Sequence, residues 1–220
     1  MTTSWREVAR FRAELYCFLG HCLLEPIEEN RAALLQPSFW REFPLATAND
    51  TMRAALVALG DVTAKLAALA PEEALRRVQL EYAVLFLGTG ERTALPWESF
   101  YRTEERLLFG LPALQVREIM ARFGVEVAAK YRQPEDHLGL ELMLLAAAGE
   151  TDAGRDDWRE SAGCQAAFIA EHPLAWIAAL ERDATVNATT GFYGAIVGLT
   201  HGVLLWDREL LDEYAAGEQS

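Results

Sequence analysis

Asp136 and His137 stand side by side, and Glu141 follows four residues after the histidine. Residues four apart share one face of a helix, so His137 and Glu141 would point in the same direction. Such a group can transfer protons or bind a metal ion when a further ligand joins. The residues available to join it are His172, His201 and Cys164. None stands at a spacing typical of a metal motif, so a metal-dependent hydrolase using Asp136, His137 and Glu141 is the lesser hypothesis.

Two other interpretations of the same residues stay open. Asp136 can accept hydrogen bonds from the exposed amides of its own helix start while His137 packs in the core. Alternatively, both line a groove in which a carboxylate pairs with an arginine of a partner. Gly88-Thr89-Gly90 lacks the lysine of a phosphate-binding loop and follows a predicted helix. We therefore expect a binding protein, not an enzyme, and no cofactor or metal.

An aromatic segment precedes this cluster. Residues 89–101 include a proline and three aromatic residues without strand alternation, which predicts a loop. The helix before it carries Tyr82, Leu85 and Phe86 on one face. Aromatic side chains beside an apolar helix end are typical of a peptide-binding groove. The alternative is that the loop folds back and fills the core.

The elements that must position these residues are predicted to be helices. Ser4 to Glu7 has the spacing of a capping box, and apolar residues continue at helical spacing to Leu24. Asn49 is a candidate N-cap, and a further helix begins at Pro71 and ends at Gly88. Additional helices are expected over 28–35, from 103 to 110, over 112–123, 134–149, 158–170 and 174–180, and from 192 onward; 37–44 is expected to be a connector. The pattern predicts an all-α single domain of about nine to eleven helices.

Residues 150–157 form a polar linker and are a possible hinge. Such a hinge would permit a domain swap, so we expect a monomer or a domain-swapped dimer.

The composition excludes several classes of protein. The 220 residues are 51 % hydrophobic, with no apolar run of the roughly 18 residues that a membrane span needs. Three cysteines and the absence of a signal-peptide pattern indicate a cytoplasmic protein. Most of the net charge of −13 lies in residues 133–220, which carry 4 basic and 16 acidic side chains. Nucleic acid and anionic lipid are poor partners for such a surface, whereas a basic peptide would be steered toward it. The alternative is that the acids only keep the protein soluble.

Several motifs, in this order, resemble the TorD/DmsD family of redox-enzyme maturation chaperones. They are Tyr82-x-x-Leu85-Phe86-x-Gly88, Pro96-Trp97-x-Ser99-x-Tyr101, Leu108-Phe109-Gly110 and Pro134-Glu135-Asp136-His137-x-Gly139-x-Glu141-Leu142. The likeness covers essentially the whole chain and is densest from Tyr82 to Leu142.

The resemblance implies a cytoplasmic, all-helical chaperone that binds the twin-arginine signal peptide of a molybdenum-cofactor oxidoreductase precursor. Such a chaperone assists cofactor insertion and delays export until the client has matured. Further implied partners are the twin-arginine export machinery and cofactor-biosynthesis proteins. Carried onto this sequence, the implied binding residues are Tyr82, Leu85, Phe86, Pro96, Trp97, Ser99, Tyr101, Asp136 and His137, and we add Glu141.

These residues match the two parts of a twin-arginine signal peptide, its arginines and its apolar segment. Trp97, Leu85 and Phe86 would hold the apolar part of the peptide, and Asp136 with neighbouring acids would orient the arginines. The chain departs from the family pattern at Gln133, where glutamate is common, so one acceptor charge is lost there. Two alternatives remain: an assembly chaperone of the nitrate-reductase type that acts mainly on the body of the client, and a helical scaffold without an export substrate.

Overall fold

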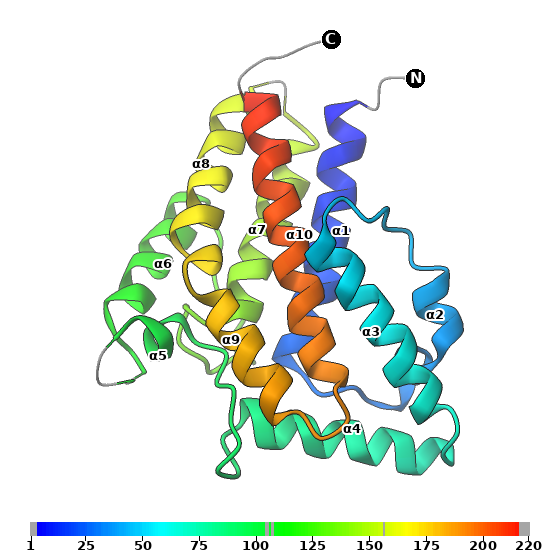
Figure 1. Cartoon of the computed structure of the whole chain (residues 1–220). Coiled ribbons are helices and arrows are strands. Elements are labelled where there is room, and N and C mark those ends of the chain that lie inside the picture. Colours follow the sequence, from blue (N-terminus) through cyan, green and yellow to red (C-terminus); the bar gives the residue numbers. More distant parts are fainter. Residues whose placement is uncertain (1–3, 104–105, 107, 156, 216–220) are drawn as a thin grey trace. The chain divides into compact units, whose positions relative to one another are not determined.

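The computed structural model describes residues 4–103, 106, 108–155 and 157–215. Within these ranges the chain is all-helical, as predicted, and contains no β-strand; its one extended pairing is an isolated antiparallel bridge between Trp97 and His137. The elements are α1 (Trp5–Leu24), the 3₁₀-helix η1 (Glu29–Leu35), α2 (Pro37–Arg41), α3 (Asp50–Leu66), α4 (Pro71–Phe86), α5 (Glu98–Arg102), α6 (Leu111–Arg122), α7 (Leu138–Asp152), α8 (Trp158–Glu171), α9 (Pro173–Asn187) and α10 (Phe192–Ala215) (Figure 1).

No helix in the described part of the chain combines the length and the apolar character that crossing a membrane requires.

The chain divides into two compact units, and neither is a single stretch of sequence. Unit 1 comprises the described residues of Met1–Leu24, Pro96–Trp176 and Leu204–Ser220. Unit 2 comprises Glu25–Leu95 and Ile177–Val203. The boundaries fall inside α9 and α10, so each of these helices contributes residues to both units.

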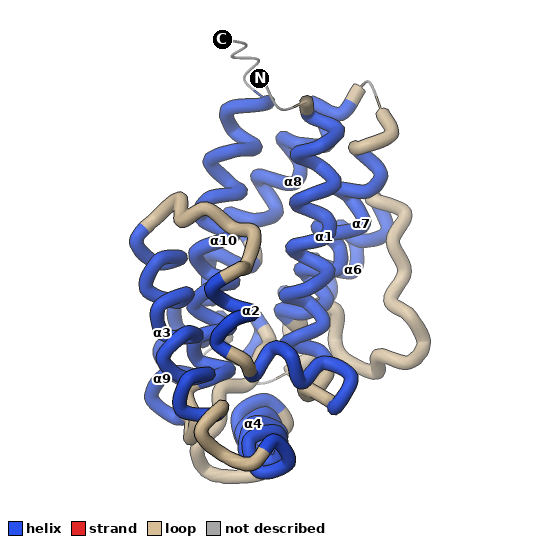
Figure 2. Tube along the Cα trace, turned by 90° about the vertical axis from the view of Figure 1, so that its right-hand side faces the viewer, coloured by secondary structure: helices blue, strands red, loops and turns tan. Residues whose placement is uncertain are grey.

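In unit 1, α1, α7, α8 and the C-terminal part of α10 run side by side (Figures 1 and 2). Small residues let α1 and α7 approach closely: a Cβ added at Gly139 would lie 2.6 Å from Cγ of Leu24 and 3.1 Å from the carbonyl oxygen of Gly20. Aromatic rings fill the remaining space. The Trp5 ring stacks on Trp158 with centroids 4.1 Å apart.

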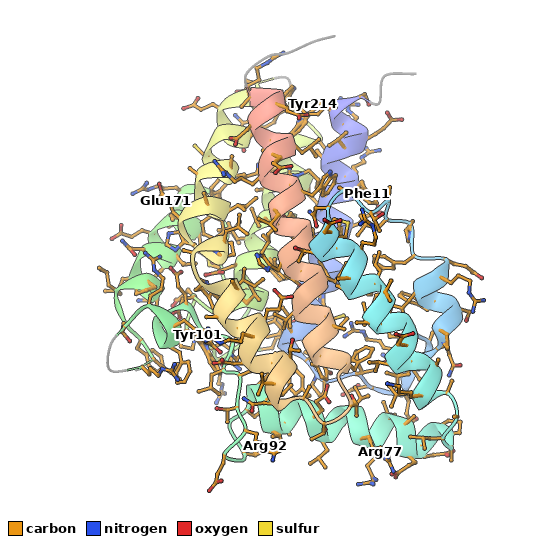
Figure 3. The ribbon with its side chains drawn as sticks, viewed as in Figure 1. Phe11, Arg77, Arg92, Tyr101, Glu171 and Tyr214 are labelled. Carbon is orange, nitrogen blue, oxygen red and sulfur yellow. The ribbon has the colours of Figure 1, made fainter. Side chains whose placement is uncertain are left out.

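Phe11 of α1, labelled in Figure 3, meets Trp206 of α10 edge to face at 6.3 Å between ring centroids.

In unit 2, α4 lies across the direction of α3 (Figure 1). Its inner face carries Tyr82 and Phe86, whose ring centroids each lie 5.3 Å from that of Tyr193. Its outer face carries charged side chains such as Arg77, which points away from the helix (Figure 3) and pairs with Glu73 at 2.6 Å. This division explains the apolar stripe that the sequence places on one face of α4.

Glu81 of α4 is a buried exception to this division. One carboxylate oxygen accepts hydrogen bonds from the backbone amides of Thr190 and Gly191, the latter at 3.1 Å, and the other accepts from the Tyr193 amide at 2.9 Å. These amides surround the start of α10, where a negative charge is favoured. A side chain of α4 therefore caps a helix far along the chain.

Several predicted boundaries are confirmed. Ser4 and Glu7 form the reciprocal hydrogen bonds of a capping box at the start of α1. The Asn49 side chain accepts from the Met52 amide at 2.8 Å. Gly88 follows α4 with a φ of 67°, a left-handed conformation that glycine adopts readily.

Other predictions of local structure were wrong. Residues 37–41 form α2 instead of a connector, and residues 98–102 form α5 inside the predicted loop. The helix expected from residue 134 begins at Leu138, because residues 136–138 pair with 96–98 before it starts. The same helix was expected to end at Gly149, but it continues to Asp152. A Cβ at Gly149 would lie 3.0 Å from the carbonyl oxygen of Ala9, so glycine at this position allows α7 to pack closely against α1. The short helix expected from residue 103 falls partly on 104, 105 and 107, outside the described residues.

The polar segment 150–157 lies within unit 1. Its first residues, through Asp152, belong to α7, and residue 156 is outside the described part of the chain. The hinge therefore stays a prediction.

Candidate functional site

In unit 1, two segments that the sequence singled out, residues 96–98 and 136–138, pair with each other. The Glu98 amide donates to the carbonyl oxygen of Asp136 at 3.0 Å, and the Leu138 amide donates to that of Pro96 at 2.9 Å. The Trp97 ring meets His137 edge to face, with centroids 5.1 Å apart. Segments distant in the sequence are thus joined by backbone hydrogen bonds, with the aromatic pair beside them.

Asp136 caps a helix other than its own. One carboxylate oxygen accepts from the Ser99 amide at 2.8 Å and also from the Ser99 hydroxyl, both in the first turn of α5. Of the interpretations left open for Asp136, the one in which it serves the amides of its own helix start is therefore wrong. Burial raises the pKa of Asp136, an effect that the Ser99 hydrogen bonds partly offset. This external cap explains why α5 forms where the local sequence predicts a loop.

His137 is the N-cap of α7. Its Nδ1 accepts from the Gly139 amide at 3.0 Å, so the ring carries its proton on Nε2. The side chain is only 2 % exposed, and burial lowers the pKa of His137 to about 3. The imidazole is therefore neutral near pH 7. Its position in the core agrees with one of the interpretations above, whereas its role as a helix cap was not predicted.

A buried group of three ionisable side chains lies next to this capping pair. It consists of Glu98 in α5, Glu141 in the first turn of α7 and His172 between α8 and α9. Nδ1 of His172 lies 2.8 Å from one Glu98 oxygen, and Arg102 pairs with the other. Burial raises the pKa of Glu141, and the nearby carboxylates of Glu98 and Asp136 raise it further.

Sequence reasoning missed Glu98 and gave His172 only a minor place. Glu98 stands between Trp97 and Ser99, so a carboxyl flanked by two residues already singled out was the available signal. His172 precedes Pro173 at a helix boundary, and nothing in its spacing relates it to Glu98 or Glu141. Their proximity depends on the packing of α5, α7 and α8.

The other predicted residues are mostly buried. Pro96, Trp97 and Ser99 are buried in unit 1, and Tyr101 is half-buried with its ring stacked on Trp176 at 5.5 Å. In unit 2, the core contains Tyr82, Leu85 and Phe86, which are 4 %, 0 % and 1 % exposed. The structure thus gathers the seven predicted residues of unit 1 in one region: Pro96, Trp97, Ser99 and Tyr101 with Asp136, His137 and Glu141. The three of unit 2 contribute to a different core.

Glu135 stands two residues after Gln133, and its carboxylate already pairs with an arginine of this chain. Arg117 of α6 donates to its two oxygens at 2.7 and 2.9 Å, and this guanidinium lowers the pKa of Glu135. An arginine of a client would therefore compete with Arg117 for this carboxylate.

Unit 1 also has an open groove between α6, α7 and α8, with a volume of about 410 Å³. Its apolar lining includes Ile119, Phe123, Ala148, Ala167 and Phe168, and its polar lining includes Arg122, Arg155, Asp157, Glu160, Cys164 and Glu171. Figure 3 marks Glu171 at the end of α8. Arg155 and Asp157 pair with each other at 2.8 Å. The groove therefore combines an apolar wall with exposed carboxylates.

The groove is in contact with the predicted site through its lining. The Phe168 ring stacks on His172 at 5.1 Å, and His172 in turn pairs with Glu98. Arg102 of α5 donates to the backbone oxygen of Glu171 at 2.8 Å. His172 and Arg102 thus link the buried region around Glu98 to Phe168 and Glu171 in the lining of the groove.

Comparison with known proteins gives one consistent result. The family model described as "Nitrate reductase delta subunit" matches residues 48–182. A protein of Vibrio cholerae (strain ATCC 39541) named "Chaperone protein TorD" is 31 % identical over 209 residues, which cover 92 % of each chain. Proteins of the same name from Vibrio vulnificus (strain YJ016) and Psychrobacter sp. are 28 % and 25 % identical, over 91 % and 98 % of this chain and 94 % and 98 % of theirs. With a family match over more than half of its residues and relatives along nearly its whole length, the chain belongs to the TorD family of chaperones.

Proposed function

We propose that this protein is a cytoplasmic chaperone that binds the twin-arginine signal peptide of a molybdoenzyme precursor. It holds the apo-subunit for cofactor insertion and delays its export, and it acts by binding alone. Membership of the TorD family supports the chaperone role. The observation that carries the peptide-binding role is the groove between α6, α7 and α8, because it offers both kinds of contact that such a peptide needs.

A twin-arginine peptide presents two guanidinium groups followed by an apolar segment. In this proposal the apolar segment packs on Ile119, Phe123 and Ala167, while Glu160 and Glu171 accept hydrogen bonds from the arginines. Both carboxylates belong to exposed residues, so pairing does not require an ion to be buried first. The acidic C-terminal part of the chain would speed the encounter with a basic peptide.

The residues singled out from the sequence have a supporting role in this proposal. Trp97, Asp136 and His137 are buried, so we assign them to holding the α5 segment and His172 behind the groove. Tyr82, Leu85 and Phe86 are likewise buried in unit 2, and a peptide reaches them only if their neighbours in that unit move. We propose that they shape the client-binding surface of that unit.

The test is calorimetric titration with twin-arginine signal peptides of molybdoenzyme precursors. Each peptide is compared with a control whose arginines are replaced by lysines and with one whose apolar segment is interrupted. Binding that is lost with the interrupted segment and weakened with lysine supports the proposal, because lysine cannot form the bidentate pair. If no peptide binds, the signal-peptide role is refuted.

A pair of variants examines the groove itself. Ala167 is exposed and lines the groove, so Ala167→Trp fills it without disturbing the core. Ala175→Trp is the matched control, because Ala175 is exposed on α9 and does not line the groove. We expect the first to abolish peptide binding and the second to preserve it. Equal affinity in both would move the site elsewhere.

The charges and the thiol in the groove allow two further comparisons. Glu160→Gln and Glu171→Gln should weaken binding and reduce its salt dependence, whereas Glu118→Gln on the exposed part of α6 should not. Cys164 is an exposed thiol in the lining, so bound peptide should slow its alkylation. An unchanged alkylation rate at saturating peptide would argue against occupancy of the groove.

The match to the nitrate reductase delta subunit model favours a second candidate function. In that case the protein binds mainly the body of the client subunit. Co-purification with client precursors that either carry or lack the signal peptide separates the two functions. Equal recovery of both precursors would favour this second candidate.

A further inference from the structure

Glu141 is an unusual side chain among the described residues. It is completely buried, and neither of its carboxylate oxygens makes a well-formed hydrogen bond to the described residues, although the Trp176 indole and Glu98 lie close enough to interact with it. A buried carboxylate without a partner is strongly disfavoured, and such groups in native proteins usually serve a ligand or a proton. Because its pKa is raised, Glu141 needs either a proton or a positive partner in this site.

The surroundings of Glu141 do not supply that partner. The guanidinium of Arg102, which pairs with Glu98, is also engaged by the backbone oxygen of Glu171. Asp136 adds a further carboxylate whose influence reaches Glu141. The region thus brings three carboxyl groups together in unit 1, those of Glu98, Asp136 and Glu141, while the charge of Arg102 is paired with Glu98.

The three side chains have the arrangement of a metal-binding group. Glu98, Glu141 and His172 each offer one ligand atom, and these atoms all lie within 4.8 Å of one another. Ligands about 2.0–2.2 Å from a common ion stand roughly 3–4 Å apart, so small shifts of the side chains suffice. A histidine with two carboxylates is a donor set that suits zinc and neighbouring divalent ions.

We propose that Glu98, Glu141 and His172 bind a divalent transition-metal ion, for which zinc is the probe. The ion would supply the positive partner that Glu141 lacks. It would also join α5, the start of α7 and the α8–α9 junction, which come from three separate parts of the sequence. With three protein ligands, one coordination position stays available to a water molecule or another small ligand. The proposal does not depend on which client the protein binds.

The test is calorimetric titration of the chelator-treated, full-length protein with zinc chloride. Other potential zinc ligands are removed first by Cys17→Ser and Cys164→Ser, because Cys164 is exposed and Cys17 lies 3.5 Å from His21 Nδ1. We expect a single equivalent of zinc to bind. Failure to bind zinc in this background would overturn the proposal.

Three variants locate the site. Glu141→Gln and His172→Asn should each weaken zinc binding by at least about tenfold, the scale seen when groups around a metal are removed. His201→Asn is the control, because His201 forms a similar histidine–carboxylate pair with Glu181 at 2.6 Å but has no part in the group. Unchanged affinity in both Glu141→Gln and His172→Asn would overturn the assignment.

X-ray absorption on the zinc-loaded protein with its native cysteines keeps the test decisive if a variant fails to fold. The proposed donor set predicts nitrogen and oxygen neighbours only. Sulfur among the neighbours of the ion would place the zinc on a cysteine and refute the site.

Discussion

Arg12 of α1 and Asp207 of α10 form a fully buried ion pair between the first and the last helix of unit 1. The Arg12 Nη2 donates to Oδ2 of Asp207 at 2.9 Å, and the Tyr16 hydroxyl donates to the same oxygen at 2.7 Å. The Gln165 side chain accepts from Arg12 and donates to Asp152 at 2.7 Å. A polar network therefore runs through the centre of this helical unit.

Breaking this ion pair should strongly destabilise the protein. Asp207→Asn leaves the Arg12 charge buried without its counterion, which costs about 3–5 kcal/mol of unfolding free energy. Urea denaturation measures the loss. Asp212→Asn is the control, because its pairing with Arg208 at 3.5 Å is half exposed, and its loss should be below about 1 kcal/mol. Similar losses in both variants would mean that the buried pair contributes no more than a surface pair.

Acidification should destabilise the protein through His137. Its pKa is about 3 in the folded protein and near 6.5 when unfolded, so the unfolded state binds the proton more tightly. The His137 contribution to stability is complete above about pH 6.5 and is lost as the pH falls toward about 3. By linkage it amounts to about 2 kcal/mol lost between about pH 7 and pH 5.

The variant His137→Asn isolates this effect. Asparagine can still accept the Gly139 amide as an N-cap but does not titrate. We expect its unfolding free energy to decline less between about pH 7 and pH 5 than that of the unmodified protein, by about 2 kcal/mol. Parallel pH profiles for the two proteins would show that His137 can be protonated in the folded state.

Gly139→Ala should destabilise the contact between α1 and α7. The added methyl group would lie 2.6 Å from Leu24 Cγ, and the resulting shift should cost about 1–3 kcal/mol although alanine favours helices. Gly163→Ala in α8 is the control, because the new Cβ has no atom within 4 Å and should stabilise the helix by about 0.5–1 kcal/mol. Opposite shifts in melting temperature are expected, and equal shifts would contradict the close approach.

Glu81→Gln should weaken the start of α10 in unit 2. An amide group can accept through only one of its two ends, so the hydrogen bonds from Gly191 and Tyr193 cannot both be kept. Loss of a hydrogen bond to a charged group should cost about 2 kcal/mol, and hydrogen exchange should quicken for the first amides of α10. Glu91→Gln, at an exposed position, should leave both quantities unchanged.

The sequence predicted those features that depend on neighbouring residues. The capping box at Ser4, the N-cap at Asn49 and the stop at Gly88 arise from interactions within a few residues, so a single stretch of sequence contains the necessary information. The apolar stripe of α4 likewise identified Tyr82 and Phe86 as residues of one helix face. The all-helical class follows from the same periodicity.

The features that were missed depend on distant partners. α5 forms where the local sequence predicts a loop because Asp136, far along the chain, caps its first turn. The group of Glu98, Glu141 and His172 and the ion pair of Arg12 with Asp207 also require the tertiary packing of separate helices. Periodicity reports which face of a helix is buried but not what lies opposite that face.

The division of both units into separate stretches of sequence has a consequence during synthesis on the ribosome. Unit 1 needs residues from its first, middle and last stretches, and unit 2 needs both Glu25–Leu95 and the stretch that ends at Val203. Neither unit can close its hydrophobic core until the residues of α10 have left the ribosome. Both cores therefore stay unfinished for most of translation. Apolar surface stays exposed during that time, which is when a growing chain is most prone to aggregate. This member of a chaperone family would thus itself pass through a long stage without a closed core.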